Sequence, residues 1–541
     1  MKSSLFKLIL RGLILGGGVL AFACVANAAT FLNTYGTGEE FNLWQNAGPV
    51  ILTELGCSST ATFFTTDGNS GVAVGTGCPA AISKDNGVSD GFIYFSFTDL
   101  ASWDGIDAVN NFYDEDNWGT YHGPFSDPVL NTSTTGDPTV VNPCATKTSP
   151  NANQRLVATC AQPGCTTGLV TTNSAKLGYA CQAIHIGVSN LEASSLVQET
   201  IGTLQGPIDG QDAGTGYTRR KFPKTGVSTS HLPKTVSVTV NGTLNSRYPN
   251  PSSPIVYPYG FYVNPGVTAT TCSSEASNAA LVGSYCLADT DCGSTSPSGT
   301  CTSQTINNLT RLQVVALFSG AIKNWSDFGG YYANNILPVT LCLRHSGAGT
   351  LAVLDLGVMQ GSDGKGWGAN LVTEENRVAS GEPPYIYFNN TQGDEKNCLT
   401  WANGGTLSTS TNPDTGHTNV PDTLPSDVKG GAVGFLDADN GNTANYVQVK
   451  YNGTFGTRVT MRDGIFDDFW IMDRLYAAPG LLAGQLAVYG QMLTFASKPD
   501  NFTNANLGGS RGSYYGSSTE LNFPKANASV YPYLYKGGGL P

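Results

Sequence analysis

A strand, a short loop of small residues and the start of a helix follow one another around Arg344, and this order constrains the fold more than any other feature. Residues Leu337–Leu343 (LPVTLCL) predict a short buried strand, and the apolar run from Leu351, which lacks proline, predicts a helix. The loop between them, Arg344–Thr350 (RHSGAGT), is rich in small residues that let backbone N–H groups turn inward. Its arginine adds a planar set of donors. The pattern predicts an anion-sized pocket or, more plainly, a tight turn beside a surface arginine.

A second pattern lies upstream of this loop and is more specific. Residues Asn308–Asp327 (NLTRLQVVALFSGAIKNWSD) resemble a segment of the phosphate-binding proteins of ABC transporters. In that family a loop of the form R-x-D-G-S-G-T follows at a short distance, and Arg344–Thr350 lies at the matching place. The chain is therefore similar to a divergent member of the phosphate-binding protein family. The resemblance covers Tyr179–Leu191 and Val256–Phe435 and is thin elsewhere.

The resemblance implies two further ligand-binding loops. The family's G-A-G-A-T-F loop is similar to Gly36–Phe41 (GTGEEF), although Glu40 stands where the family has a hydroxyl residue. The family's D-F-G-A-S-D loop is similar to the strand end at Ser189, where Asn190 replaces an aspartate. Carried over residue by residue, the implied ligand-binding set is Arg344, Ser346, Gly347, Ala348, Gly349, Thr350, Ser189, Asn190, Glu40 and Phe41.

Three departures argue against simple phosphate capture. Asn190 replaces an acceptor-only carboxylate that would take the proton of hydrogen phosphate, and Ala348 lacks the family's hydroxyl group. Glu40, if it faced the cleft, would repel an anion about 4 Å away by about 4 kcal/mol. Glutamates here also simply favour a helix N-terminus, and a Ser-Asn pair suits an ordinary turn after a strand. Either Glu40 points elsewhere, or the ligand differs, or binding has been lost.

The resemblance also implies the fold class, which is α/β: a two-lobed periplasmic binding protein (type II) fold with discontinuous lobes, a hinge and disulfide-rich insertions. The first lobe would comprise residues 29–262 and 440–541, with insertions around 57–165 and 205–250. The second lobe would comprise residues 263–439, with a Cys-rich insertion at 272–301. Closure of the cleft between the lobes would bring the three loops together around the ligand.

The first 28 residues read as a secretory signal peptide. Three basic residues precede the apolar run Leu13–Ala23, and Ala26–Ala28 (ANA) forms an A-x-A cleavage site. The run is too short to span a bilayer, and no later stretch reaches the roughly 18 apolar residues that a spanning helix needs. Because of this signal peptide, we expect an exported chain in the periplasm or at the cell surface, without a transmembrane segment once mature. The alternatives are a membrane anchor and a lipoprotein attached at Cys24.

The cysteines predict disulfides. Removal of Cys24 with the signal would leave an even number of the 13 cysteines, and in an exported chain this favours disulfides over metal ligation. One group of four lies in a polar stretch too small to bury a core of its own, and these residues should pair among themselves: Cys272, Cys286, Cys292 and Cys301. Cys160 and Cys165 are candidates for closing a local loop.

Composition and motifs argue against two classes of function, nucleic-acid binding and catalysis. A net charge of −12 argues against nucleic acid as a partner, because no broad basic face is available for phosphates. The H-E-x-x-H motif and the P-loop are absent from the sequence. The string G-x-S-x-G occurs at 87–91 (GVSDG) and 508–512 (GGSRG), but neither match lies between an expected strand and an expected helix as a nucleophile elbow does, so we expect neither an enzyme nor a cofactor. The first hypothesis is an exported solute-binding protein that captures phosphate or a related oxyanion in an interlobe cleft, with an ABC permease as the expected partner. The alternative is an extracellular structural or adhesion protein that reuses the scaffold with altered or lost binding.

Overall fold

The computed structural model describes residues 29–64, 70–84, 89–100, 102, 105, 108, 109, 154–160, 177–190, 252–273, 281–293, 299–344, 349–359, 369, 371, 383–389, 392–404, 429–466, 469–478, 480–507 and 511–518. The signal peptide expected at 1–28 and the insertion expected at 205–250 lie outside these residues. None of the helices within these ranges is long and apolar enough to cross a membrane.

The elements have the following bounds. The strands are β1 (Thr30–Thr37), β2 (Ser59–Phe64), β3 (Ser70–Thr76), β4 (Ile93–Leu100), β5 (Gln154–Cys160), β6 (Leu177–Ala183), β7 (Ile186–Ser189), β8 (Ser252–Val263), β9 (Thr268–Cys272), β10 (Cys301–Thr305), β11 (Asn308–Leu309), β12 (Thr340–Arg344), β13 (Tyr385–Asn389), β14 (Ala432–Asp437), β15 (Val447–Tyr451), β16 (Trp470–Ala477) and β17 (Gly516–Ser517). The α-helices are α2 (Glu39–Glu54), α7 (Arg311–Phe318), α8 (Gly349–Val353), α10 (Gln392–Ala402), α11 (Arg458–Arg462), α12 (Ala483–Ser497) and α13 (Asn504–Leu507). Short 3-10 turns are η6 (Asp289–Cys292), η7 (Trp325–Phe328), η8 (Gly330–Tyr332), η11 (Ala438–Asn440), η12 (Pro499–Phe502) and η13 (Arg511–Ser513), and η9 (Leu354–Met359) is a π-helix.

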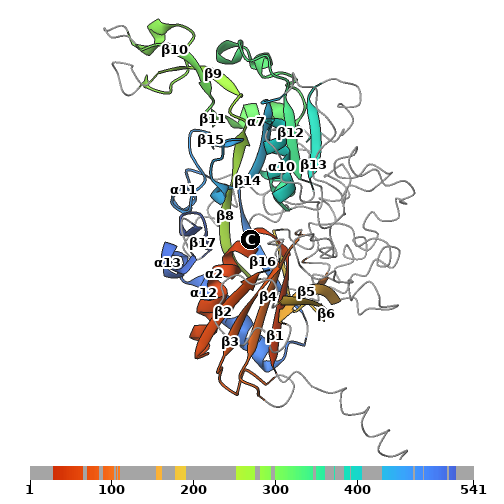
Figure 1. The fold of residues 1–541 in the computed structure, drawn as a ribbon. Helices are drawn as coiled ribbons and strands as arrows, with labels where there is room; N and C mark the ends of the chain where they lie inside the picture. The colour runs from red at the N-terminus through yellow and green to blue at the C-terminus, as the bar shows by residue number, and fades with distance from the viewer. Residues whose placement is uncertain are drawn as a thin grey trace, which may run out of the picture.

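One large mixed sheet runs through the described part of the protein and is flanked by helices (Figure 1). It contains 13 of the described strands, in the main order β13-β12-β14-β8-β16-β7-β1-β4-β3-β2, with β11, β15 and β17 paired beside this path. The chain is therefore of the mixed α/β class that the sequence predicts. Strands β5 and β6 form a separate antiparallel pair.

Strands β1, β4 and β7 form the parallel centre of one half of the sheet. Strand β1 pairs in parallel with β4 on one side and with β7 on the other, so the carboxyl ends of all three meet at one edge. Helix α2 follows β1 and packs Trp44 edge-to-face against Phe95 of β4, with ring centroids 5.9 Å apart. The stretch 57–165, expected as an insertion, supplies β2, β3 and β4 to this half.

The other half of the sheet is built around β12, which pairs in parallel with β13 and β14. The predicted strand at Leu337–Leu343 begins later in the structure and extends through Arg344, since Pro338 has no N–H to give to the ladder. The helix expected from Leu351 begins two residues earlier, as α8, and continues as the π-helix η9. Helix α7 starts with a capping box, in which Thr310 Oγ1 accepts the Gln313 N–H at 3.3 Å and Gln313 Oε1 accepts the Thr310 N–H at 2.9 Å.

Strand β8 connects the two halves. One end pairs with β14 and β15, and the other end pairs with β16 and β17 (Figure 1). Tyr257, Tyr259 and Phe261 alternate along β8 and are buried, and Phe261 stacks on Phe469 with ring centroids 4.7 Å apart. The core is therefore continuous from one half to the other along this strand.

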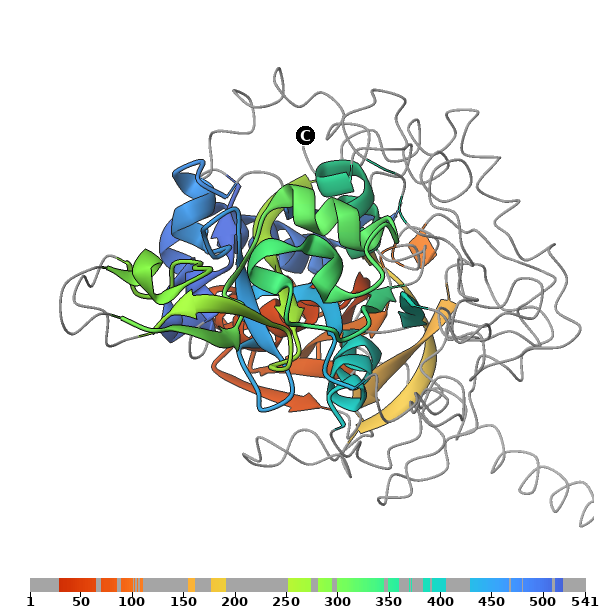
Figure 2. The ribbon, with the colours of Figure 1, turned by 90° about the horizontal axis from the view of Figure 1, so that it is seen from above.

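Four disulfides lie within the described residues. The four clustered cysteines pair as Cys272–Cys292, which joins β9 to η6, and Cys286–Cys301, which joins β10 to the segment just before η6. This hairpin projects away from the large sheet in both views (Figures 1 and 2). The Sγ atoms of Cys272, Cys286 and Cys292 lie within 4.8 Å of one another, because two disulfides pack together here. The other pairs are Cys57–Cys78 and Cys342–Cys398, whereas Cys165 and the side chain of Cys160 lie outside the described residues.

Candidate functional site

Three strand ends and one helix start meet at the junction between the two halves of the sheet. Strand β1 ends at Thr37, β7 ends at Ser189 and leads to Asn190, and Ser102 lies just past the end of β4. Because these strands are parallel neighbours, their carboxyl ends share one edge. Gly349, the first residue of α8, reaches this edge from the other half. The junction therefore brings together Thr37, Asn190 and Gly349, one described residue from each of the three segments that the sequence singled out.

The side chain of Asn190 is fully buried at the centre of this junction. Its Oδ1 accepts hydrogen bonds from Thr37 Oγ1 at 2.9 Å and from Ser102 Oγ at 2.7 Å. Its Nδ2 donates to Tyr257 OH at 2.5 Å and to Asp473 Oδ1, and the Tyr257 hydroxyl donates to the same carboxylate oxygen at 3.0 Å. The amide is thus satisfied at both ends by protein groups.

Asp473 gives a physical reason for the amide at position 190. Its carboxylate is fully buried on β16, and a second carboxylate at 190 would place two like charges in contact in an apolar interior. Sequence analysis interpreted Asn190 as a departure from a family pattern or as part of an ordinary turn, and it did not identify Asp473. The available signal was the charged pair Asp473-Arg474 inside the otherwise apolar strand WIMDRLYA. Arg474 Nη1 donates to the carbonyl oxygen of Asn190 at 3.4 Å.

The start of α8 touches the opposite half directly. The backbone N–H of Gly349 donates to Ser102 Oγ at 3.1 Å. A Cβ atom at position 349 would lie 2.4 Å from Asn190 Cβ and 2.5 Å from Ser102 Oγ, so only glycine fits here. The neighbouring Thr350 is buried, and its Oγ1 has no hydrogen-bond partner within the described residues.

Arg344 ends β12 and is only 5% exposed. A fully buried carboxylate, Glu395 of α10, lies within its electrostatic reach. Burial raises the pKa of Glu395 to about 8, while the positive charge of Arg344 and the hydrogen bond from the Phe435 N–H oppose this rise. Sequence analysis did not identify Glu395, because a single glutamate in a polar helix segment carries no signal of burial.

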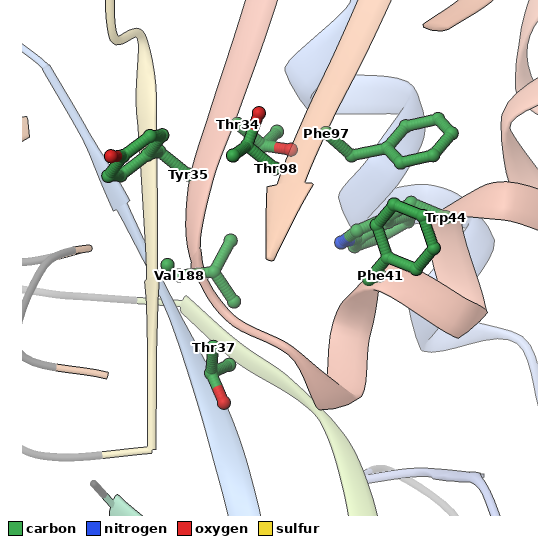
Figure 3. A pocket seen from close by; sticks show the side chains of 9 residues that line it. Thr34, Tyr35, Thr37, Phe41, Trp44, Phe97, Thr98 and Val188 are labelled. Atoms are coloured by element: carbon green, nitrogen blue, oxygen red, sulfur yellow. The ribbon is translucent and has the colours of Figure 1, made fainter. Parts of the chain in front are cut away.

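A small cavity lies beside Thr37, between β1, β4 and α2 (Figure 3). Its volume is about 10 Å³, close to the minimum of about 10–15 Å³ that one water molecule requires. Phe41 lines it and packs against Phe97 with ring centroids 5.3 Å apart, which places Phe41 in the core of this half. Figure 3 shows Phe41 and Trp44 together on the helix side of the cavity, across from Val188. The cavity has no room for an oxyanion.

The expected site residues divide into those within and those outside the described residues. Ser346, Gly347 and Ala348 lie outside the described residues, as does the side chain of Glu40, although the backbone of Glu40 forms the first turn of α2. Ser189 is buried and pairs with Arg474 in the β7–β16 ladder. Of the expected set, the structure brings Asn190 and Gly349 into direct contact.

The sequence matches no known family model and no curated protein. Three solved structures resemble parts of the chain. A putative phosphate ABC transporter substrate-binding protein with bound phosphate from Clostridium perfringens shares 10% identity at a TM-score of 0.26, over 49% of this chain and 71% of that chain. An ABC-type phosphate transport receptor from Vibrio cholerae shares 12% identity at a TM-score of 0.25, over 45% of this chain and 66% of that chain. PstS from Borrelia burgdorferi shares 11% identity at a TM-score of 0.25, over 48% of this chain and 70% of that chain. The similarity is distant and partial.

Proposed function

We propose that the chain is an exported binding protein, not an enzyme, that holds a small oxyanion of the phosphate class between Arg344–Thr350 and the edge where β1 and β7 end, for delivery to an ABC-type transporter. The convergence of donors from both halves on this junction carries the proposal. The described donors are the hydroxyls of Thr37 and Ser102 and the N–H of Gly349. Arg344, which is buried, and Thr350, whose hydroxyl has no hydrogen-bond partner among the described residues, are the two ends of the segment Arg344–Thr350. Hydroxyl, amide and guanidinium donors are the groups that stabilise oxyanions.

Binding would require the two halves to separate locally. The N–H of Gly349 and the hydroxyl of Ser102 now bond to each other, so an anion would have to replace this hydrogen bond. The amide of Asn190 would remain below the ligand, held by Asp473. Since this arrangement offers the ligand donors and no vacant acceptor at Asn190, sulfate, which carries no proton, should bind more tightly than hydrogen phosphate.

Titration calorimetry tests this function. The mature protein is titrated with phosphate and with sulfate, and chloride serves as the control anion. Saturable binding of either oxyanion is expected, and Arg344→Ala should weaken it at least tenfold, since it removes a charged, bidentate donor. Arg462→Ala is the matched control, because Arg462 lies in an exposed ion pair with Asp463 and should leave binding unchanged. Equal affinity in the parent and in Arg344→Ala would contradict the assigned site.

One observation favours a second candidate function, an extracellular structural protein that has lost ligand binding. The junction is closed by direct contacts between protein groups, with Gly349 against Asn190 and Ser102. The same titrations separate the two candidates. Lack of binding by phosphate and sulfate, together with a radius of gyration that neither anion changes, would favour the structural role.

A further inference from the structure

The most unusual buried group outside the junction is the carboxylate of Glu395. The residue is 0% exposed, and its Oε1 accepts the Phe435 N–H at 2.9 Å. Its Oε2 is buried and has no hydrogen-bond partner within the described residues. A buried carboxylate oxygen without a donor is costly when ionised, so this group requires an explanation.

The fold turns the face of α10 that carries Glu395 toward the face of β12 that carries Arg344. The disulfide Cys342–Cys398 joins β12 to α10. Cys342 and Arg344 are two residues apart on a strand and share one face, while Glu395 and Cys398 are three residues apart on a helix and share one face. The disulfide therefore turns the Arg344 face of β12 toward the Glu395 face of α10.

A glycine on the neighbouring strand makes room for this carboxylate. A Cβ atom at Gly434 of β14 would lie 3.1 Å from Glu395 Oε1 and 3.3 Å from Cys342 Cβ. Glu395 thus occupies a narrow space over β14, next to the strand that carries Arg344. No side chain at position 434 separates the two elements.

The charged groups around Glu395 come from each packed element. Arg344 of β12 favours its ionisation, and so does Lys396 of α10, whereas burial and Asp437 of β14 oppose it. Strand β13 adds the buried Tyr385 to the same layer. Burial is the largest effect and raises the pKa of Glu395 to about 8. At neutral pH the carboxyl is therefore protonated and does not neutralise Arg344.

We infer that Glu395 is a positioning residue whose proton keeps the charge of Arg344 available, and that an anion bound at Arg344 draws a proton onto Glu395. This inference rests on the proposed function. An added negative charge near a buried carboxylate disfavours its ionised form. By linkage, anion affinity should be constant while Glu395 is protonated and should fall by up to about tenfold per pH unit once Glu395 ionises in the free protein.

Sulfate is the probe that isolates this effect, because it does not itself titrate between neutral and alkaline pH. Calorimetry of the mature protein, Glu395→Gln and Glu54→Gln is run across a pH series in two buffers of different ionisation enthalpy. Glu54 is the matched control, since it lies on the exposed end of α2. The parent and Glu54→Gln should lose affinity above about pH 8 and take up a proton on binding. Glu395→Gln should bind with a pH-independent affinity and without proton uptake.

A second measurement does not depend on sulfate. A carboxyl whose pKa is raised in the folded state from 4.5 to about 8 stabilises the protein less as pH rises through that window, because the unfolded chain ionises first. The unfolding midpoint of the parent should therefore fall relative to that of Glu395→Gln over this range. A constant difference would overturn the inference.

The outcomes separate the inference from the proposed function. Sulfate binding that depends on Arg344 but has the same pH slope in Glu395→Gln would overturn only the inference. If neither sulfate nor phosphate binds at any pH, the proposed function fails and the coupling fails with it.

Discussion

The backbone N–H of Gly349 donates a 3.1 Å hydrogen bond to the hydroxyl of Ser102, a residue 247 positions earlier in the chain. This bond joins the first turn of α8 to the edge where β1, β4 and β7 end. The same hydroxyl donates to Asn190, which in turn contacts Asp473. A continuous set of hydrogen bonds thus runs from one half of the sheet through the buried centre of the other.

Gly349→Ala should destabilise the protein by about 1–3 kcal/mol, because the added methyl group would overlap Asn190 and Ser102. Urea unfolding measures this change. Gly490→Ala is the control: position 490 lies within α12 and has open space around it, so alanine should stabilise the protein by up to about 1 kcal/mol. Equal effects at the two positions would mean that the junction is not packed as described.

Asn190→Asp should cost on the order of 3 kcal/mol at neutral pH, since it buries a second carboxylate against Asp473. The loss should shrink as pH falls, because the two carboxyls can then share a proton. The exchanged pair Asn190→Asp/Asp473→Asn restores one amide and one carboxylate and should recover most of the stability. An exchanged pair that is no better than the single variant would argue against the direct contact.

His185 should make stability depend on pH in acid. Burial lowers its pKa from 6.5 to about 4, and its Nδ1 accepts the Asn33 N–H at 2.9 Å. The unfolded chain therefore binds the proton first, and stability should fall by about 3 kcal/mol as pH drops from 6.5 to about 4. Thermal unfolding of His185→Gln should lack this part of the slope. A parental slope in the variant would assign the acid sensitivity to other groups.

Removal of the Cys342–Cys398 disulfide should affect both stability and the anion site. The bond closes a loop with a sequence separation of 56, so replacing both cysteines by alanine should cost about 4 kcal/mol in urea unfolding. It should also weaken sulfate binding, because the disulfide holds α10 against the strand of Arg344. The double variant Cys286→Ala/Cys301→Ala, with a separation of 15, should cost about 3 kcal/mol and leave sulfate binding unchanged. Equal effects on binding would contradict this difference.

Local features of this protein were readable from the sequence alone. The strand, loop and helix around Arg344 follow from an apolar run, small residues and the position of Pro338, with an error of a few residues at each boundary. The clustered cysteines indicated disulfides within one short stretch, whereas the α/β class was implied by the resemblance to a known family. For the local elements and the clustered disulfides, the interactions that decide the structure lie between residues close together in the chain.

Only the tertiary structure decided which polar groups meet. Asp473 lies against Asn190, Ser102 against Gly349, and Glu395 within electrostatic reach of Arg344, and the two residues of each pair are far apart in the sequence. The order of strands in the sheet sets these contacts, and the sequence pattern around each residue does not encode that order. Burial then changes the chemistry, because a carboxylate that would be an ordinary surface charge on α10 keeps its proton once the sheet covers it.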